Sequence, residues 1–455
     1  MLIVAAAQEN YFTEWRSHQR EYRQILLSKA ETESEVKGAR AFSIEIRQVV
    51  LPDRGSVDRC ISCHLGTDDP RMIDVEQPYA AHPDPYLQDH EIDRFGCTVC
   101  HQGQGQATVK EDAHAVANGV FWELPLLPAR LSQSVCGTCH DPVYLGDRGG
   151  SLLAAGLDAF RSQGCLGCHK LGGRGGPMGP ALDHVGDKGR HAYSFAHLEE
   201  GPQQVWTWHR AHLRAPSEIV PESMMPPVML DDDGIDALTA YLMSLRTTNL
   251  TERLTPMDRY VHRYRIWHTE PYSGEELYEQ FCLACHEDGT ETLFHDSLDV
   301  TIPAIRHPDF LAVASTEFLV ENMLLGREGT PMTAWGEGGG GLTRDELGRI
   351  AEYLLEARQE VVMPDFTLAE DADRENGARI FQDECTDCHS LDAAGSDAPW
   401  LGSAGFQQTY SDALMGHTIK HGRTDTLMMG YGENVDGDLT DQDISDLVKY
   451  IRTLQ

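Results

Sequence analysis

The sequence is poor in basic side chains for its 455 residues. It contains 37 Lys and Arg against 72 Asp and Glu, which gives a formal net charge of −35. A field of this sign repels phosphate backbones and anionic lipid surfaces, so we expect no nucleic-acid partner. The same charge favours a basic protein partner, but it also fits a plain solubility role. The sequence leaves these two interpretations open.

Long apolar runs are also missing. No stretch of 18 apolar residues occurs, so the chain contains no complete transmembrane helix. The short apolar stub Met1–Ala7 runs straight into polar sequence, and we interpret it as the remnant of a signal peptide or of a membrane anchor. The glycine run Gly338–Gly341 has no Lys-Ser/Thr after it, so it is a flexible loop rather than a phosphate-binding loop.

No cysteine is left over for a disulfide or a separate zinc site, because all twelve fall in six C-x-x-C-H motifs. One such motif alone would be ambiguous between a redox pair, half a zinc site and a haem attachment site. Six copies, each followed by histidine, are typical of c-type haem attachment. The cysteines are Cys60, Cys63, Cys97, Cys100, Cys136, Cys139, Cys165, Cys168, Cys282, Cys285, Cys385 and Cys388.

The spacing of this motif suits haem chemistry. Two thiols three residues apart reach the two vinyl groups on one edge of the porphyrin, and the next histidine lies under the iron as its proximal ligand. We therefore predict six covalently bound haem c groups with iron. The predicted proximal ligands are His64, His101, His140, His169, His286 and His389.

The region around the first three motifs has histidines but few methionines. Met72 is the only methionine between the first motif and residue 150. We therefore predict that His82, His90 and His114 are distal ligands of three bis-His haems, with His18 in reserve. Which of these histidines serves which haem stays open.

From residue 151 onward a pattern of roughly 100 residues occurs three times. Each copy begins with a short helix before its haem motif and ends with an amphipathic helix. We predict a mainly α fold, in which an irregular trihaem module precedes three helical domains. The predicted segments are 1–50 with the anchor remnant and a helix, 51–150 with the trihaem module, and domains at 151–250, 270–360 and 370–455. Residues 251–270 are expected to form a linker helix.

Each copy also carries a methionine in a loop before its last helix. These are Met225, Met332 and Met428, with Met429 as a rival in the third copy. A thioether is a soft neutral ligand that raises the potential of haem iron, whereas an ordinary methionine fills core space. Their repeated position predicts that Met225, Met332 and Met428 are distal ligands.

Residues 150–455 resemble three consecutive class I cytochrome c domains, in the order of helix, haem motif, proline, methionine and final helix. The resemblance implies crossed first and last helices in each domain. Gly156, Gly274 and Gly377 would then closely approach Tyr241, Tyr353 and Tyr450, respectively. It also implies that a proline carbonyl holds each proximal histidine, through Pro180, Pro303 and Pro399.

Residues 8–150 resemble the N-terminal part of membrane-anchored multihaem cytochromes that accompany quinol oxidation of the cytochrome b or alternative complex III type. The matching stretches include Glu14-Trp15, Val57–Gly66 and Phe95–Gly103. The resemblance implies a quinol-oxidising membrane complex as electron donor. It also implies a place on the periplasmic side of the membrane, anchored by a helix missing from this chain.

These features predict a periplasmic electron-transfer subunit with no catalytic residue of its own. Electrons would enter through the bis-His haems, which have low potentials, and leave through the His/Met haems. The acceptor would be soluble or membrane-bound, and a basic cytochrome is one candidate. Two alternatives remain: an extracellular cytochrome filament with His18 donated between protomers, and a reductase or peroxidase with an open haem iron.

Overall fold

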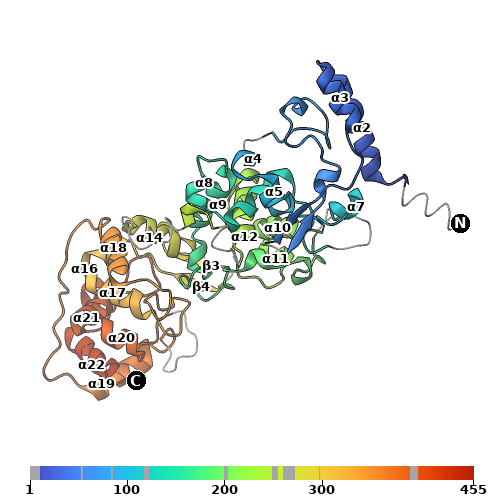
Figure 1. The fold of residues 1–455 in the computed structure, drawn as a ribbon. Helices are drawn as coiled ribbons and strands as arrows, with labels where there is room; N and C mark the ends of the chain where they lie inside the picture. The colour runs from blue at the N-terminus through green and yellow to red at the C-terminus, as the bar shows by residue number, and fades with distance from the viewer. Residues whose placement is uncertain are drawn as a thin grey trace. The chain divides into compact units, whose positions relative to one another are not determined.

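The computed structural model describes residues 11–52, 55–83, 86–116, 122–198, 203–247, 255–259, 272–296, 298–389 and 398–454 (Figure 1). The stub Met1–Ala7 and most of the expected linker helix at 251–270 lie outside the described residues. In the described part, strands form two antiparallel pairs, Val49–Leu51 (β1) with Ser56–Asp58 (β2) and Leu293–His295 (β3) with Val300–Ile302 (β4). The other regular elements are helices, which confirms the mainly α prediction.

The chain divides into two compact units, which we describe separately. The first unit comprises residues 1–154, 186–208 and 239–262, and the second comprises residues 155–185, 209–238 and 263–455. The helices Ser151–Ser162 (α9), Val205–Arg214 (α10) and Asp232–Ser244 (α12) belong in part to each unit. The domain boundaries expected from the sequence stay a prediction.

The first unit begins with two helices, Glu14–Lys29 (α2) and Glu33–Ala41 (α3), where the sequence had predicted one. The apolar face of α2 places Tyr22 against Met72 and Tyr79 in a buried cluster. Met72 is fully buried, so the one methionine near the first motifs is a core residue.

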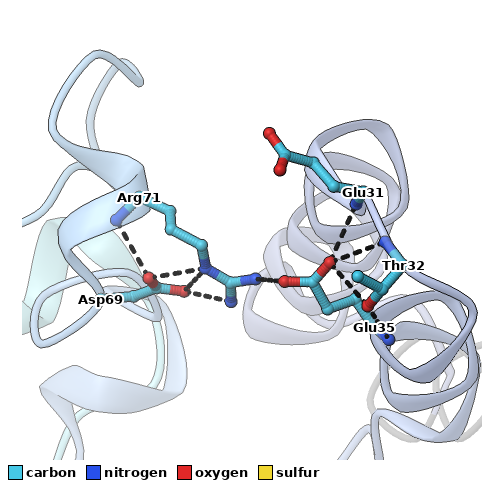
Figure 2. A network of polar contacts seen from close by, with 5 residues as sticks. All are labelled: Glu31, Thr32, Glu35, Asp69 and Arg71. Carbon is cyan, nitrogen blue, oxygen red and sulfur yellow. Dashed lines mark hydrogen bonds and ion pairs between the residues drawn. The ribbon is translucent and has the colours of Figure 1, made fainter.

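Figure 2 shows why the chain breaks between these helices. Thr32 caps α3 by accepting a hydrogen bond from the Glu35 backbone, while Glu35 accepts one from the Thr32 backbone. This reciprocal capping box satisfies donors that a helix start leaves unpaired. Arg71 then contacts both Glu35 and Asp69, at 3.4 and 2.7 Å, and so connects α3 to the loop after the first haem motif.

The rest of the first unit consists of short turns of helix, as expected where haems fill much of the interior. Each C-x-x-C-H motif lies on such a turn or directly after one. The turns are Cys60–Ser62 (η2), Pro70–Met72 (η3), Tyr86–Asp89 (α4), Ile92–Phe95 (α5), Thr98–His101 (α6), Lys110–Ala113 (α7), Ala129–Thr138 (η4), Pro142–Leu145 (α8) and Arg190–Ala192 (η7).

The second unit contains the second and third repeats, in which four helices correspond in the same order and one short helix of each repeat has no counterpart in the other. The second repeat has Gly274–Phe281 (α14), Leu283–His286 (α15), Pro308–Val313 (α16), Thr316–Leu325 (α17) and Arg344–Leu355 (α18). The third has Arg374–Glu384 (α19), Ala404–Thr409 (α20), Asp412–His421 (α21), Glu433–Val435 (η9) and Asp441–Ile451 (α22). This unit also holds Cys165–Gly167 (η5) and Pro216–Ile219 (α11), and residues Val185–Asp187 (η6) straddle the boundary.

The first and last helices of these two repeats pack together, α14 on α18 and α19 on α22, as Figure 1 shows. A Cβ added at Gly274 would lie 2.8 Å from Tyr353 Cβ, which confirms the predicted close approach. At Gly377 an added Cβ would lie 2.0 Å from the carbonyl oxygen of Asp446, four residues before Tyr450, so this glycine also lies closely against the last helix of its repeat. Tyr450 packs against Phe381, with ring centres 5.4 Å apart.

Within the described residues, no helix combines the length and the apolar character needed to cross a bilayer.

Candidate haem sites

In the first unit, each proximal histidine faces one of the three predicted distal histidines. The ring centres are 6.1 Å apart for His64 and His114, 6.3 Å for His82 and His101, and 5.9 Å for His90 and His140. Two imidazoles that bind one metal from opposite sides, at about 2 Å each, have ring centres about 6 Å apart. The three pairs therefore fit bis-His ligation, and they assign each distal histidine to one motif.

The reserve histidine has another neighbour. His18 Nδ1 lies 2.9 Å from the hydroxyl oxygen of Tyr79, and the ring that packs beside His64 belongs to His114. Burial lowers the pKa of His64, and the nearby His114 lowers it further. Burial also lowers the pKa of His101 and of His114. These shifts favour neutral imidazoles, the form that binds a metal.

Two further contacts orient these rings through the nitrogen that does not face its partner. His90 Nδ1 lies 3.0 Å from the Tyr86 carbonyl oxygen. His140 Nδ1 lies 3.0 Å from Asp258 Oδ1, and the other oxygen of Asp258 accepts a hydrogen bond from the Asp141 backbone. A carboxylate at this position fixes a metal-binding imidazole and increases its basicity. Sequence reasoning missed Asp258 because it lies far along the chain from any motif.

Asp58 is a second residue that no sequence pattern singles out. Its carboxylate is buried and accepts hydrogen bonds from the backbone of Cys60, Cys97 and Thr98, at 3.0, 2.7 and 2.8 Å. Although burial raises the pKa of Asp58, these hydrogen bonds outweigh it and hold the pKa below its usual value. One ionised carboxylate thus joins the first two haem motifs.

In the first and third repeats, a proline carbonyl holds the proximal histidine as predicted. His169 Nδ1 lies 2.8 Å from the Pro180 carbonyl oxygen, and His389 Nδ1 lies 3.1 Å from that of Pro399. Burial lowers the pKa of His286 to about 4, and its buried Nδ1 has no hydrogen-bond partner among the described residues. These contacts orient the rings so that Nε2 is left for a metal.

The three predicted methionine ligands share one local structure, which we call the Ser/Thr-x-Met turn. In each, the methionine N–H donates to a hydroxyl two residues earlier. The pairs are Met225 with Ser223 at 3.3 Å, Met332 with Thr330 at 3.2 Å and Met428 with Thr426 at 3.2 Å. The rival Met429 is 67% exposed and lies outside this turn, so the local structure favours Met428.

A cavity of about 360 Å³ lies within the second unit and suits a large apolar cofactor. His286 and Met332 line it, and so do His389 and Met428, together with the cysteines of both motifs. The fifth and sixth motifs thus open onto one continuous, largely apolar space. The residues present therefore fit haem at these two motifs.

Arg327 and Arg423 also line this cavity. Burial lowers the pKa of Arg423, and the positive charge of Arg327 adds to this effect, while Tyr410 opposes it. Arg423 Nε–H is buried and donates a hydrogen bond to no partner among the described residues. Haem brings two propionate carboxylates, the groups that buried guanidinium ions bind best, so these arginines would hold them.

Neighbouring attachment sites lie close together in two places. Cys60 and Cys97 approach within 4.8 Å through their sulfur atoms, and Asp58 lies beside them. The Cys168 and Cys285 thiols lie within hydrogen-bond distance, where the backbone of Gly164 packs against Ala284. Because Cys60 and Cys97 belong to predicted haem motifs, attachment there would consume both thiols, so the Asp58–Cys60–Cys97 group does not indicate a separate metal site.

Paired histidines beside the thiols of the first unit, and one apolar cavity beside the thiols of two repeats, suit a protein that carries covalent haem. Residues 153–246 and 374–455 match the family model described as cytochrome c, and residues 269–354 match that described as cytochrome c oxidase, cbb3-type, subunit III. The three matched segments are cytochrome c domains. Over them the chain is a c-type cytochrome, a haem protein that transfers electrons and binds haem c covalently.

One curated relative extends this comparison. The chain is 33% identical over 98 residues to cytochrome c oxidase subunit 2 of Alkalihalophilus pseudofirmus. The match covers 21% of this chain and 26% of the relative, so the chain spans about a quarter of that protein's length. The resemblance of residues 8–150 to cytochromes of quinol oxidation stays a prediction.

Proposed function

We propose that this chain is a six-haem electron-transfer subunit, with three bis-His haems in the first unit and three His/Met haems in the repeats. The pairing of His64, His101 and His140 with three separate distal histidines carries this proposal. The Ser/Thr-x-Met turn supports the other half of it, because it repeats in all three copies.

Haem supplies a one-electron couple at its iron, and the residues of the chain decide at what potential. A histidine as second ligand keeps that potential low, while a methionine raises it. The apolar cavity walls exclude water and so favour the reduced haem iron, which carries less charge. The carboxylates of Asp58 and Asp258 favour the oxidised iron, which is more positive. The proposed direction is therefore from the first unit toward the repeats.

Close contacts between attachment cysteines support transfer between neighbouring sites. The Cys60–Cys97 and Cys168–Cys285 contacts bring adjacent attachment edges together, and the fifth and sixth motifs share a cavity. The polypeptide thus holds these sites at short separations. With two axial side chains at each site, the proposal leaves no open position for a substrate.

For partners, we propose a quinol-oxidising membrane complex as donor and a respiratory acceptor. The names of two matches, a cbb3-type oxidase subunit and an oxidase subunit 2, support a respiratory setting. The net charge of −35 fits a basic acceptor such as a basic cytochrome. We place the protein on the periplasmic side of the membrane.

The haem count and ligands are tested on the purified full chain. Intact mass and the pyridine haemochrome assay are expected to give six haems per chain, and near-infrared magnetic circular dichroism is expected to give equal His/His and His/Met populations. Fewer than six haems would contradict the proposed count. A high-spin haem in the resting protein would instead favour a reductase or peroxidase.

The partners are tested by purification from membranes in mild detergent, followed by identification of bound subunits. A quinol-oxidising complex that reduces the chain is the expected result. Filaments in electron micrographs of the purified chain, with no bound membrane subunit, would contradict the proposed partner and favour an extracellular assembly.

A further inference from the structure

A cluster of three metal-binding side chains lies on the third repeat, apart from the Cys, His and Met side chains assigned to haem. His417 and His421 are one helical turn apart on α21, and Asp365 comes from the segment between α18 and α19. One candidate ligand atom from each of these residues lies within 4.8 Å of those of the other two. The imidazole rings are 4.4 Å apart between centres.

Both imidazoles contact the Asp365 carboxylate, and the Asp365 backbone N–H also donates to His417 Nδ1 at 3.4 Å. His417 Nδ1 lies 2.7 Å from Asp365 Oδ1, and His421 Nε2 lies 2.9 and 3.0 Å from its two oxygens. Tetrahedral ligands at about 2.0–2.1 Å from zinc stand about 3.3 Å from one another. A metal ion therefore requires each imidazole nitrogen to move away from the carboxylate by only a few tenths of an ångström.

The surrounding chain holds the carboxylate in place without any metal. Phe366, the next residue after Asp365, is 5% exposed and packs on Gly416 of α21. A Cβ at Gly416 would lie 2.0 Å from the Phe366 ring, so only glycine admits this contact. The packing of Phe366 thus fixes its neighbour Asp365 beside His417.

His421 also has a residue that can orient it. Its Nδ1 lies 3.3 Å from the Asn434 side-chain amide, which leaves Nε2 for the cluster. When Nε2 binds a metal, Nδ1 carries the proton, and a half-turn of the Asn434 amide presents an oxygen to accept it. This is the usual role of the second partner of a metal-binding histidine.

One cation competes for the same carboxylate. Lys420 Nζ lies 3.8 Å from Asp365 Oδ2 and 2.9 Å from Asp441 Oδ1. Asp441, from the start of α22, is the closer of the two, so Lys420 can keep one ion pair while Asp365 binds a metal. The charged groups that face the cluster are thus Lys420 and Asp441.

We propose that Asp365, His417 and His421 form a binding site for a divalent transition metal, with solvent as the fourth ligand. Two imidazoles and one carboxylate suit Zn²⁺, Cu²⁺ and Ni²⁺ rather than Mg²⁺ or Ca²⁺. The site joins the segment at Asp365 to the C-terminal end of α21, from which the loop with Met428 departs. Metal binding is therefore expected to stabilise the third repeat.

The test measures zinc binding to the haem-loaded full chain by equilibrium dialysis and elemental analysis. The wild type is expected to bind one more zinc per chain than the double variant His417→Gln/His421→Gln. Asp365→Asn is expected to weaken this zinc by about 100-fold, since even the loss of a residue that only orients a ligand costs 10–100-fold. The control His191→Gln removes an exposed histidine that pairs with Glu123, and it is expected to keep the full zinc count.

A second variant separates a metal site from a simple group of ion pairs. Lys420→Met removes the competing cation, so it is expected to raise zinc affinity several-fold and to leave the haem absorption spectrum unchanged. Equal zinc binding by the wild type and the double variant would overturn the proposal. Loss of affinity in Lys420→Met, with an unchanged circular dichroism spectrum, would overturn it too.

Discussion

In the first unit, the histidine beside each haem motif comes from another part of the sequence, whereas each repeat carries its own methionine. His114 lies beyond the second motif but faces His64 of the first. His90 precedes the second motif but faces His140 of the third. In the repeats, Met332 and Met428 follow their own motifs and line the cavity onto which those motifs open. As proposed, the first three sites therefore depend on one another, while the second and third repeats each hold their own candidate ligands.

The strongest test of this difference between the first unit and the repeats is to remove one distal ligand and to identify the haem that changes. His114→Ala is expected to convert one haem from low to high spin, because its iron loses an axial ligand. The high-spin signal should disappear when Cys60 and Cys63 are also replaced by alanine. It should persist when Cys136 and Cys139 are replaced instead.

The matched experiment in the repeats uses Met428→Ala. Its high-spin signal should disappear with replacement of Cys385 and Cys388, the cysteines of the same repeat. Electron paramagnetic resonance measures all of these signals. A His114→Ala signal that depends on Cys136 and Cys139 would show that the pairing of the first unit is different.

The second prediction exchanges the two ligand types. Met332→His is expected to lower the potential of that haem by on the order of 0.2 V, within the ~0.8 V that axial ligands span. His90→Met should shift the third haem in the opposite direction. Spectroelectrochemical titration measures both, and an unchanged potential in Met332→His would refute Met332 as a ligand.

The third prediction concerns Asp58, whose carboxylate accepts hydrogen bonds from the backbone of two haem motifs. Among the described residues of the repeats, no carboxylate makes contacts of this kind. Asp58→Asn is expected to lower the free energy of unfolding by about 3 kcal/mol, since bonds to a charged acceptor contribute about 1.5–3 kcal/mol each. Denaturant unfolding measures this. The exposed Asp74→Asn is the control and should change little.

The pH dependence gives a further check on Asp58. Its pKa is lowered in the folded state, so its contribution is fully present above the unfolded pKa of about 4. The contribution is lost as the pH falls below that value toward the folded pKa. Wild type and Asp58→Asn should therefore converge in stability in acid, and a constant difference between pH 7 and pH 3 would contradict this account.

The smallest expected effect is at Asp258. Asp258→Asn removes negative charge from His140 and weakens its donation to the iron, so the potential of the third haem should rise by about 60 mV. In the repeats, neutral proline carbonyls have this place beside His169 and His389. No shift in a redox titration would mean that Asp258 only positions the ring.

Much of the site was predictable because covalent haem attachment needs a fixed local spacing. The six motifs, the repeats and the choice of Met428 all rest on residues close together in sequence. The pairing of His82 with His101 and of His90 with His140 was not predictable, because any of three similar histidines could reach any of three motifs. Asp58 and Asp258 gave no signal at all, since a lone aspartate among 72 acidic residues carries no pattern.

For the helices too, features set by neighbouring residues were predictable, and features set by contacts between distant residues were not. The capping boxes at Ser273, Thr343 and Thr440 follow local sequence rules, so the repeat helices begin near where the pattern indicates. The closest atom to Gly377, the carbonyl oxygen of Asp446, was not predictable because the crossing point depends on how two distant helices pack. Tyr450 contacts Phe381, a pairing that spacing alone does not give.

The contact between Cys60 and Cys97 also constrains how the protein is made. Asp58 fixes the backbone of both cysteines, and their side chains are partly buried in the finished structure. A haem-attaching enzyme must reach all four thiols of these two motifs while the chain is still open. In this region, haem attachment is therefore expected to precede folding, and the polypeptide is expected to fold around the attached porphyrins.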